Sequence, residues 1–192
     1  MSPSSHPSRP LERTVTTLPR WAVGPTPLTV SDLRELTRTV AGEVLAGRYE
    51  ARADPDRRWY SLLRRDTYAD VWLIGWSRDQ ATELHDHAGS LGALTVVTGT
   101  LTERRWAQGP PPGLRTRTLA AGGGAGFPVG HVHDVVNLDD TPAISVHAYS
   151  PPLTAMHYYE VDPAGALRRT RTALTGQPEP GATEINQKEV VA

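Results

Sequence analysis

Two histidines separated by a single residue, His85 and His87, are the side chains of this sequence best suited to metal chemistry. On a β-strand, successive side chains alternate between the two faces, so both imidazoles would point the same way. Imidazole nitrogen is a common metal ligand, and two imidazoles provide two corners of a site. A third histidine further along the chain, His133, is the candidate third ligand. The spacing therefore predicts a metal site and leaves the metal open.

A second polar group, formed by Ser145, His147 and Tyr149, alternates with apolar residues over the stretch 143–149. On a strand these three side chains would share one face. They could then form a hydrogen-bonded row that points into a barrel. The pattern predicts a strand whose polar face contributes to the same site.

The composition limits the kind of fold that must position these residues. The chain has 192 residues, of which 38% are hydrophobic, with 17 glycines and 17 prolines. This length allows one domain with a core and tails, and this composition favours a turn-rich β protein over a helical bundle. The formal net charge of -1 gives no electrostatic drive towards nucleic acid or an anionic membrane.

The chain contains no cysteine, which excludes disulfides, thiolate metal ligands and cysteine nucleophiles. Its N-terminus has no apolar segment of signal-peptide length, and no run approaches the roughly 20 apolar residues that a membrane helix needs. We therefore expect a cytoplasmic protein with no nucleic-acid or membrane partner. The sequence contains no indication of an oligomeric state.

The ends of the chain differ from its centre. Residues 1–27 are rich in Ser, Pro and Thr and are expected to form a flexible arm. The next segment predicts a helix over 31–46, with Ser31 as its N-cap and Gly47 just past its end, packed outside the β domain. Residues 163–192 are expected to begin with a short helical piece and to continue as a mostly flexible tail.

The central domain is expected over residues 28–162 and, after the helix, consists of short apolar or alternating stretches between glycine- and proline-rich turns. Many short strands at regular spacing indicate a closed β sandwich or barrel. The predicted strands are 59–63, 71–76, 82–87, 93–97, 101–106, 114–120, 127–128, 133–137, 143–149 and 157–161.

The order of histidine, glycine and proline along the chain resembles the cupin superfamily. The first cupin motif contains a His-x-His pair, then an acid, then a glycine. Here His85, His87 and Gly99 fit the motif, and Gly92 takes the place of the acid. The resemblance therefore implies a site with three histidines and no carboxylate ligand.

The second cupin motif fits this chain at every position, which makes it a specific match. Its spacing selects His133, rather than the neighbouring His131, as the third ligand. The resemblance implies an all-β cupin β-barrel, a double-stranded β-helix or jelly roll, with the N-terminal helix outside. The matching residues are Gly122, Pro128, Gly130, His133 and Asn137.

Within the cupins, the chain resembles cysteine dioxygenases and related thiol dioxygenases. The resemblance covers roughly residues 59–160 and rests on the three-histidine pattern and three short blocks. It implies Fe(II) held by the three histidines, and Tyr149 placed beside bound oxygen and substrate, with His147 and Ser145 as its support. The blocks are His-Asp-His-x-x-Ser at 85–90, Thr-Gly-Thr-Leu-Thr-Glu at 98–103 and Ser-x-His-x-Tyr-Ser-Pro-Pro at 145–152.

The ligand chemistry agrees with this resemblance. Three neutral imidazoles would leave Fe(II) its full charge and open positions for a thiolate, a neighbouring amine and O2. The expected reaction adds O2 to the sulfur of L-cysteine or a related small aminothiol and gives a sulfinate. Three histidines also suit zinc with a bound water, so the ligands alone leave the metal open.

The carboxylate-binding arginine of the family has no direct match in this chain. The family usually places an arginine in a Tyr-x-Arg strand, whereas residues 60–62 read Tyr-Ser-Leu. Tyr60 is expected in the substrate site, with Arg64 or Arg65, and otherwise Arg58, supplying the positive charge after a shift of register. A shift by one residue would reverse the face to which each side chain points.

Three other functions remain open from the sequence. The first is a variant cupin oxygenase that acts on a different thiol, or on cysteine with decarboxylation or rearrangement. The second is a zinc-dependent cupin isomerase or hydrolase. The third is a non-catalytic cupin that senses a small ligand, against which the Ser-His-Tyr row argues, because a sensor needs no poised tyrosine.

Overall fold

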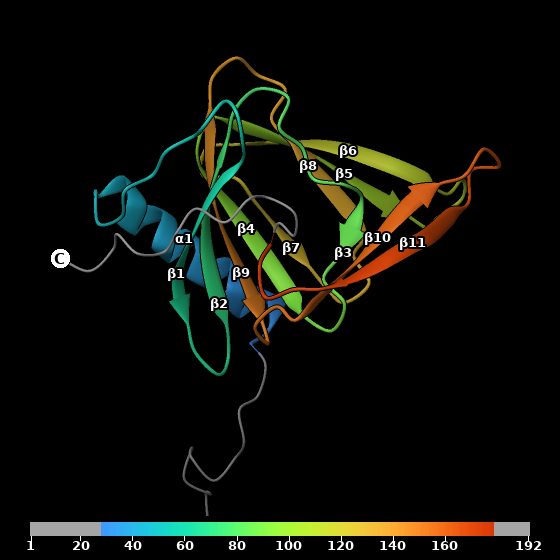
Figure 1. The fold of residues 1–192 in the computed structure, drawn as a ribbon, viewed down its shortest axis with the longest axis horizontal. Helices are drawn as coiled ribbons and strands as arrows, with labels where there is room; N and C mark the ends of the chain where they lie inside the picture. The colour runs from blue at the N-terminus through green and yellow to red at the C-terminus, as the bar shows by residue number, and fades with distance from the viewer. Residues whose placement is uncertain (1–27, 179–192) are drawn as a thin grey trace, which may run out of the picture.

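The computed structural model describes residues 28–178, which form two antiparallel β-sheets with one helix on the outside (Figure 1). The expected N-terminal arm and residues 179–192 lie outside the described residues. The elements, in chain order, are α1 Val30–Leu45, β1 Trp59–Arg65, β2 Asp70–Trp76, β3 His85–Asp86, β4 Leu91–Thr98, β5 Thr100–Ala107, β6 Gly113–Ala120, β7 Gly124–Phe127, β8 His133–Val136, β9 Ala143–Ser150, β10 Ala155–Val161 and β11 Leu167–Leu174.

One sheet has five strands in the order β1-β2-β9-β4-β7, and the other has six in the order β11-β10-β3-β8-β5-β6. Neighbours in the sheets are often distant in the sequence, as β2 beside β9 and β3 beside β8. The two sheets enclose a common apolar core, which confirms the predicted all-β barrel of the cupin type with a helix packed outside.

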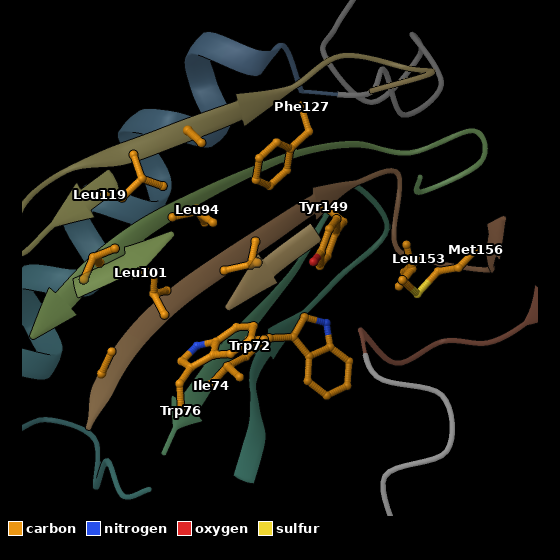
Figure 2. Packing of buried hydrophobic residues seen from close by; sticks show 14 of the residues in the cluster. Trp72, Ile74, Trp76, Leu94, Leu101, Leu119, Phe127, Tyr149, Leu153 and Met156 are labelled. Carbon is orange, nitrogen blue, oxygen red and sulfur yellow. The ribbon is translucent and has the colours of Figure 1, made fainter. Parts of the chain in front are cut away.

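The side chains of strand β2 alternate between two apolar clusters, one on each face of its sheet. It is buried along its whole length, as its nearly continuous apolar run predicts for a strand covered on both faces. Trp72, Ile74 and Trp76 point into the core between the sheets, where Figure 2 shows them together. Val71 and Leu73 point the other way and pack with residues of α1.

Helix α1 starts earlier than predicted, because its N-cap is Thr29 and not Ser31. Thr29 and Asp32 form a capping box: the Thr29 hydroxyl oxygen accepts from the Asp32 amide at 3.2 Å, and the Asp32 carboxylate accepts from the Thr29 amide at 2.8 Å. These bonds satisfy amides that have no partner within a helix. Hydrogen bonds from Thr29 also lower the pKa of Asp32. At the other end, Gly47 has φ of +75°, as expected for the glycine after a helix.

The apolar face of α1 covers the five-stranded sheet (Figure 1). Leu33 and Val40 are fully buried there. The approach is close: a Cβ on Gly126 of β7 would lie 2.4 Å from Val30 Cγ1. Among residues 28–178, no helix combines the length and apolar character that crossing a membrane requires.

Replacing Leu33 with alanine is expected to lower the free energy of unfolding by about 2–5 kcal/mol, because it removes a fully buried side chain and leaves a cavity under α1. Chemical denaturation measures this change. The matched control is Leu45→Ala at the exposed end of the same helix, expected to stay within about 0.5 kcal/mol. Equal losses for the two variants would contradict the packing described for α1.

The C-terminal part of the described chain differs from its prediction. Residues 167–174, expected as a helical piece and flexible tail, instead form β11, which pairs with β10. Gly165, with φ of +80°, lies in the turn between these strands. Most side chains of β11 are exposed, so no apolar period marks the strand. It is held by backbone pairing and by the Arg171 guanidinium, 3.5 Å from the ring centre of Tyr158.

Candidate metal centre

Three histidines from neighbouring strands meet between the two sheets. His85 of β3 lies directly opposite His133 of β8, and His87 follows β3 immediately. Each is at most 4% exposed, and their ligand nitrogens lie within 4.8 Å of one another. Only two residues of the strand predicted over 82–87 pair as β3. The structure thus brings together the three histidines that the motif spacing selected.

Hydrogen bonds on the far side of two of these rings orient them towards the shared space. His85 Nδ1 lies 2.7 Å from the Glu83 carbonyl, and His133 Nδ1 lies 3.0 Å from Glu103 Oε1. A carbonyl and an ionised carboxylate only accept, so Nδ1 carries the proton and Nε2 the lone pair in both rings. Within the described residues, Nε2 of His87 and of His133 is buried with no hydrogen-bond partner. Such nitrogens are costly unless satisfied, and a metal ion would satisfy them.

Burial lowers the pKa of all three imidazoles, because the charged form loses its hydration. At His85 and His87 the neighbouring histidines lower the pKa further. A neutral imidazole keeps the lone pair that a metal needs. The position of the nitrogens and their charge state therefore both fit a metal cofactor.

Glu103 of β5 lies behind His133 and was not identified from the sequence as part of the site. Its fully buried carboxylate accepts hydrogen bonds from His131 Nε2 and His133 Nδ1, both at 3.0 Å, and pairs with Arg117. Burial raises the pKa of Glu103, but these hydrogen bonds outweigh it and hold the pKa well below its usual range. His131 thus contacts the support of His133 rather than the space shared by His85 and His87.

Gly92 of β4 explains sterically why no acid completes the ligand set. It lies opposite Tyr149 in the register of β4 and β9. A Cβ at this position would come within 2.9 Å of Phe127 Cδ2 and 3.0 Å of Tyr149 Cδ1. Real Cβ atoms do not approach other atoms so closely, so a larger residue here would displace the tyrosine ring. Glycine at this position leaves room for Tyr149.

A buried row of hydrogen-bonding groups connects β2 with β9. Trp76 Nε1 donates to Ser145 Oγ at 2.8 Å, and Ser145 Oγ lies 2.9 Å from His147 Nε2. His147 Nδ1 lies 3.4 Å from the Tyr149 hydroxyl oxygen. Ser145, His147 and Tyr149 therefore share one strand face, as their alternation predicts. Trp76 was not marked by the pattern, because its indole comes from a different strand.

The row has a direction, which follows from its donors and acceptors. Burial lowers the pKa of His147 to about 3, so its ring is neutral near pH 7. An indole N–H only donates, so the Ser145 hydroxyl accepts from Trp76 and keeps its own proton free to donate to His147 Nε2. In that tautomer His147 Nδ1 carries the proton and donates to the Tyr149 oxygen. With this tautomer the hydroxyl proton of Tyr149 would be directed away from His147.

His147 and Tyr149 of the row line one small hollow together with His85 and His133. The Tyr149 ring also lies close to a ligand, with its centre 4.7 Å from that of the His87 ring. The Tyr149 hydroxyl thus lies in the same buried region as the three candidate ligands. The hollow is lined by Ile74, Thr82, His85, His133, Val135, His147, Tyr149 and Pro178.

Comparison with known families agrees with this arrangement. The family model of cysteine dioxygenase type I matches residues 28–162, which is well over half of the chain. The chain belongs to the cysteine dioxygenase type I family. This membership confirms the resemblance seen in the motifs. At the level of the family, the protein is a cupin-type metal oxygenase of the thiol dioxygenase kind.

Solved structures of other proteins show partial similarity. The protein TT1209 from Thermus thermophilus is 25% identical over 53% of this chain and 90% of that chain, with a TM-score of 0.46. The cupin-superfamily sugar phosphate isomerase SPO2919 from Silicibacter pomeroyi is 23% identical over 63% of this chain and 83% of that chain, with a TM-score of 0.44. An oxalate oxidase in complex with glycolate is 17% identical over 52% of this chain and 55% of its own, at 0.44. Among curated proteins, none matches significantly.

The two arginines expected at the substrate site of this cysteine dioxygenase family member lie on different faces of β1. Arg64 pairs with Glu43 of α1, and so lies on the helix side of the sheet. Arg65 pairs with Asp70 and donates to the Gly176 carbonyl. Neither of the two lines the hollow. Arg64 is thus turned to the helix side, whereas the Arg65 guanidinium lies on the core side, 5.5 Å from the ring centre of Trp72.

Tyr60 and Arg58 lie on the core side of the five-stranded sheet. The Tyr60 ring packs edge-on against Trp72, and its hydroxyl donates to Gln177 at 2.9 Å. The Arg58 guanidinium lies 4.5 Å from the ring centre of Trp76. Arg58 also lines a second hollow, which adjoins the first because both include His85 in their lining. Arg58 is thus the arginine nearest to the metal centre in the lining of either hollow.

Proposed function

We propose that this protein is a mononuclear non-haem iron thiol dioxygenase. It would add both atoms of O2 to the sulfur of L-cysteine or a related small aminothiol and release a sulfinate. The observation that carries the proposal is the convergence of three neutral imidazoles beside the Tyr149 hydroxyl, with Gly92 where an acid ligand would stand. The reaction balances without a further co-substrate, because a thiolate and O2 together contain every atom and electron of the sulfinate.

His85, His87 and His133 would hold the iron through their Nε2 atoms. Bound Fe(II), keeping its full charge among neutral ligands, would favour the thiolate form of the substrate and supply the redox chemistry with O2. The hollow beside these ligands would exclude bulk water, which strengthens every electrostatic interaction inside it.

Tyr149 would donate a hydrogen bond to the oxygen that develops negative charge as sulfur is oxidised. The row supports this role, since in the tautomer with the proton on Nδ1 His147 would donate to the tyrosine oxygen, and the tyrosine would use its own proton as a donor. A donor already oriented before the reaction needs no reorganisation when charge develops. Ser145 and Trp76 would hold His147 in the required tautomer.

The proposal is tested by loading the purified protein with iron under anaerobic conditions and then adding O2 and a panel of small thiols. We expect consumption of one O2 per thiol and, by mass spectrometry, a product that gains two oxygen atoms. Iron-loaded protein that consumes no O2 with any thiol would refute the proposal. A decarboxylated or rearranged product would indicate the variant oxygenase, and zinc-dependent activity unaffected by anaerobic conditions would indicate an isomerase or hydrolase.

We further propose that Arg58 attracts the substrate carboxylate. Its guanidinium is held by Trp76 and the Ala81 carbonyl in the lining of the hollow next to His85. A carboxylate joined to a thiol through a short chain could therefore approach Arg58 while its sulfur lies near the histidines. The substrate class would be small thiols that carry a carboxylate.

Replacing Arg58 with methionine is expected to lower kcat/KM for L-cysteine about 10–100-fold, since a charge-assisted hydrogen bond contributes about 1.5–3 kcal/mol. Cysteamine, which lacks the carboxylate, is the internal control and should be affected much less. Arg64→Met is the matched protein control, because Arg64 pairs with Glu43 on the helix side. An equal loss for both thiols in Arg58→Met would exclude carboxylate recognition by Arg58.

A further inference from the structure

Glu103 differs from every other carboxylate that the structure describes near the metal centre, because it is fully buried and touches a ligand directly. It extends from β5 behind His133, on the side of that ring opposite to Nε2. One of its oxygens accepts from both His133 and His131, and the other pairs with Arg117. Three donors from two segments of the chain therefore converge on one buried carboxylate.

Stability alone gives a poor account of this arrangement. Removing a carboxylate from water is expensive, and a buried ion pair often contributes less to stability than apolar residues of the same volume. Arg117 lies opposite Glu103 in the register of β5 and β6, and its side chain is 39% exposed. The charge is thus balanced from the solvent side, while the second oxygen is aimed at the histidines.

The chemical effect of Glu103 falls on the tautomer of His133. An ionised carboxylate cannot donate, so the bond at 3.0 Å requires the proton on His133 Nδ1 and leaves the lone pair on Nε2. A neutral backbone carbonyl holds His85 in the same tautomer. A carboxylate partner makes an imidazole a stronger ligand than a carbonyl does, because it stabilises charge drawn towards the metal.

We infer that Glu103 is a positioning residue for the metal centre: it fixes the tautomer and ring orientation of His133 and thereby sets how tightly the site holds its metal. Arg117 and His131 complete the support by keeping the carboxylate ionised and in place. This inference rests on the metal site of the proposed function. It is independent of the substrate and of the outcome of the reaction.

The test measures metal retention rather than turnover. Protein loaded with Co(II) is mixed with excess chelator, and the rate of metal loss is followed by the Co(II) absorption. We expect metal loss to be about 10–100-fold faster in Glu103→Ala, as is typical when the partner of a ligating histidine is removed. Glu103→Gln keeps the shape and one acceptor but no charge, and should lie between Glu103→Ala and the wild type.

Asp134→Asn is the matched control. Asp134 is the neighbour of His133, is buried and pairs with Arg104 between the same two strands, β5 and β8. It makes no hydrogen bond to a ligand among the described residues. Removing the charge of Asp134 tests whether any carboxylate near His133 affects metal retention. We expect metal loss close to the wild-type rate.

A second readout separates positioning from general loosening of the fold. In the Co(II) protein, the shifted proton signals of Nδ1–H groups report each hydrogen-bonded ligand. We expect the His133 signal to broaden by exchange with solvent in Glu103→Ala, while that of His85 persists. Both signals should persist in Asp134→Asn. Circular dichroism identifies variants that do not fold, in which case the isosteric Glu103→Gln decides.

The outcomes distinguish this inference from the proposed function. Wild-type rates of metal loss and an unchanged His133 signal in Glu103→Gln and in folded Glu103→Ala would overturn the role of Glu103 alone. Faster metal loss together with a protein that oxidises no thiol would support Glu103 and refute the dioxygenase. A wild-type protein that retains no metal would overturn both.

Discussion

Replacing His87 with alanine is expected to abolish metal retention and to lower kcat/KM for thiol oxidation by about 10³-fold or more. The metal contributes several kcal/mol to the transition state, and each 1.36 kcal/mol corresponds to a factor of ten. The buried Nε2 of His87 has no hydrogen-bond partner within residues 28–178, so its loss removes a ligand without breaking a hydrogen bond of that atom. Elemental analysis and O2 uptake measure the two effects.

His157→Ala is the control for this variant. His157 lies on β10, opposite Asp86 of β3, and its ring bonds to Thr172 on the outer hairpin. The His157→Ala substitution therefore removes an imidazole from the adjacent strand without removing a predicted ligand. Metal content should remain at the wild-type level. Full metal retention in folded His87→Ala would contradict the three-histidine site.

Replacing Tyr149 with phenylalanine is expected to lower kcat about 10²–10³-fold with unchanged metal content and a small change in KM. The variant keeps the ring beside His87 and removes only the hydroxyl that ends the buried row. The loss falls on kcat because the hydroxyl is proposed to act on charge that develops during the reaction, and a well-placed donor contributes about this much. Steady-state kinetics and metal analysis on the same sample measure both quantities.

Two further variants make the result for Tyr149 specific. Ser145→Ala breaks the row between Trp76 and His147 and should lower kcat less than Tyr149→Phe, because it acts only through the tautomer of His147. Tyr68→Phe changes an exposed tyrosine and should leave the kinetics unchanged. A Tyr149→Phe enzyme with wild-type kcat would refute the proposed hydrogen bond to the reacting oxygen.

Much of the fold was accessible from the sequence because its signals are local. The apolar run of β2 and the alternation along β9 each determine which side chains share a face, since the period of a strand is two. The glycine, proline and histidine spacing of the second motif identified the cupin family, which the match over residues 28–162 confirms. The same spacing separated His133 from His131, which the structure places beside Glu103.

Tertiary structure decided where the arginines of β1 point. The register of β1 and β2 shifts between Leu62 and Arg64, so Leu63 is the extra residue of a bulge. One extra residue exchanges the two faces of a strand. Arg64, which would otherwise share the inward face of Tyr60, therefore pairs with Glu43 of α1. Neighbouring residues in the sequence carried no signal of this shift.

The sequence by itself thus determined the family, the all-β class and the histidines and tyrosine that local periods place on one face. Only the tertiary structure showed that Glu103 supports His133 across 30 residues, that Arg58 rather than Arg64 lies by the site, and that residues 167–174 form a strand. The physical reason is the same in each case. These features arise from the pairing and register of neighbouring strands, β5 with β8, β1 with β2 and β10 with β11, and that pairing leaves no period in the segment that takes part in it.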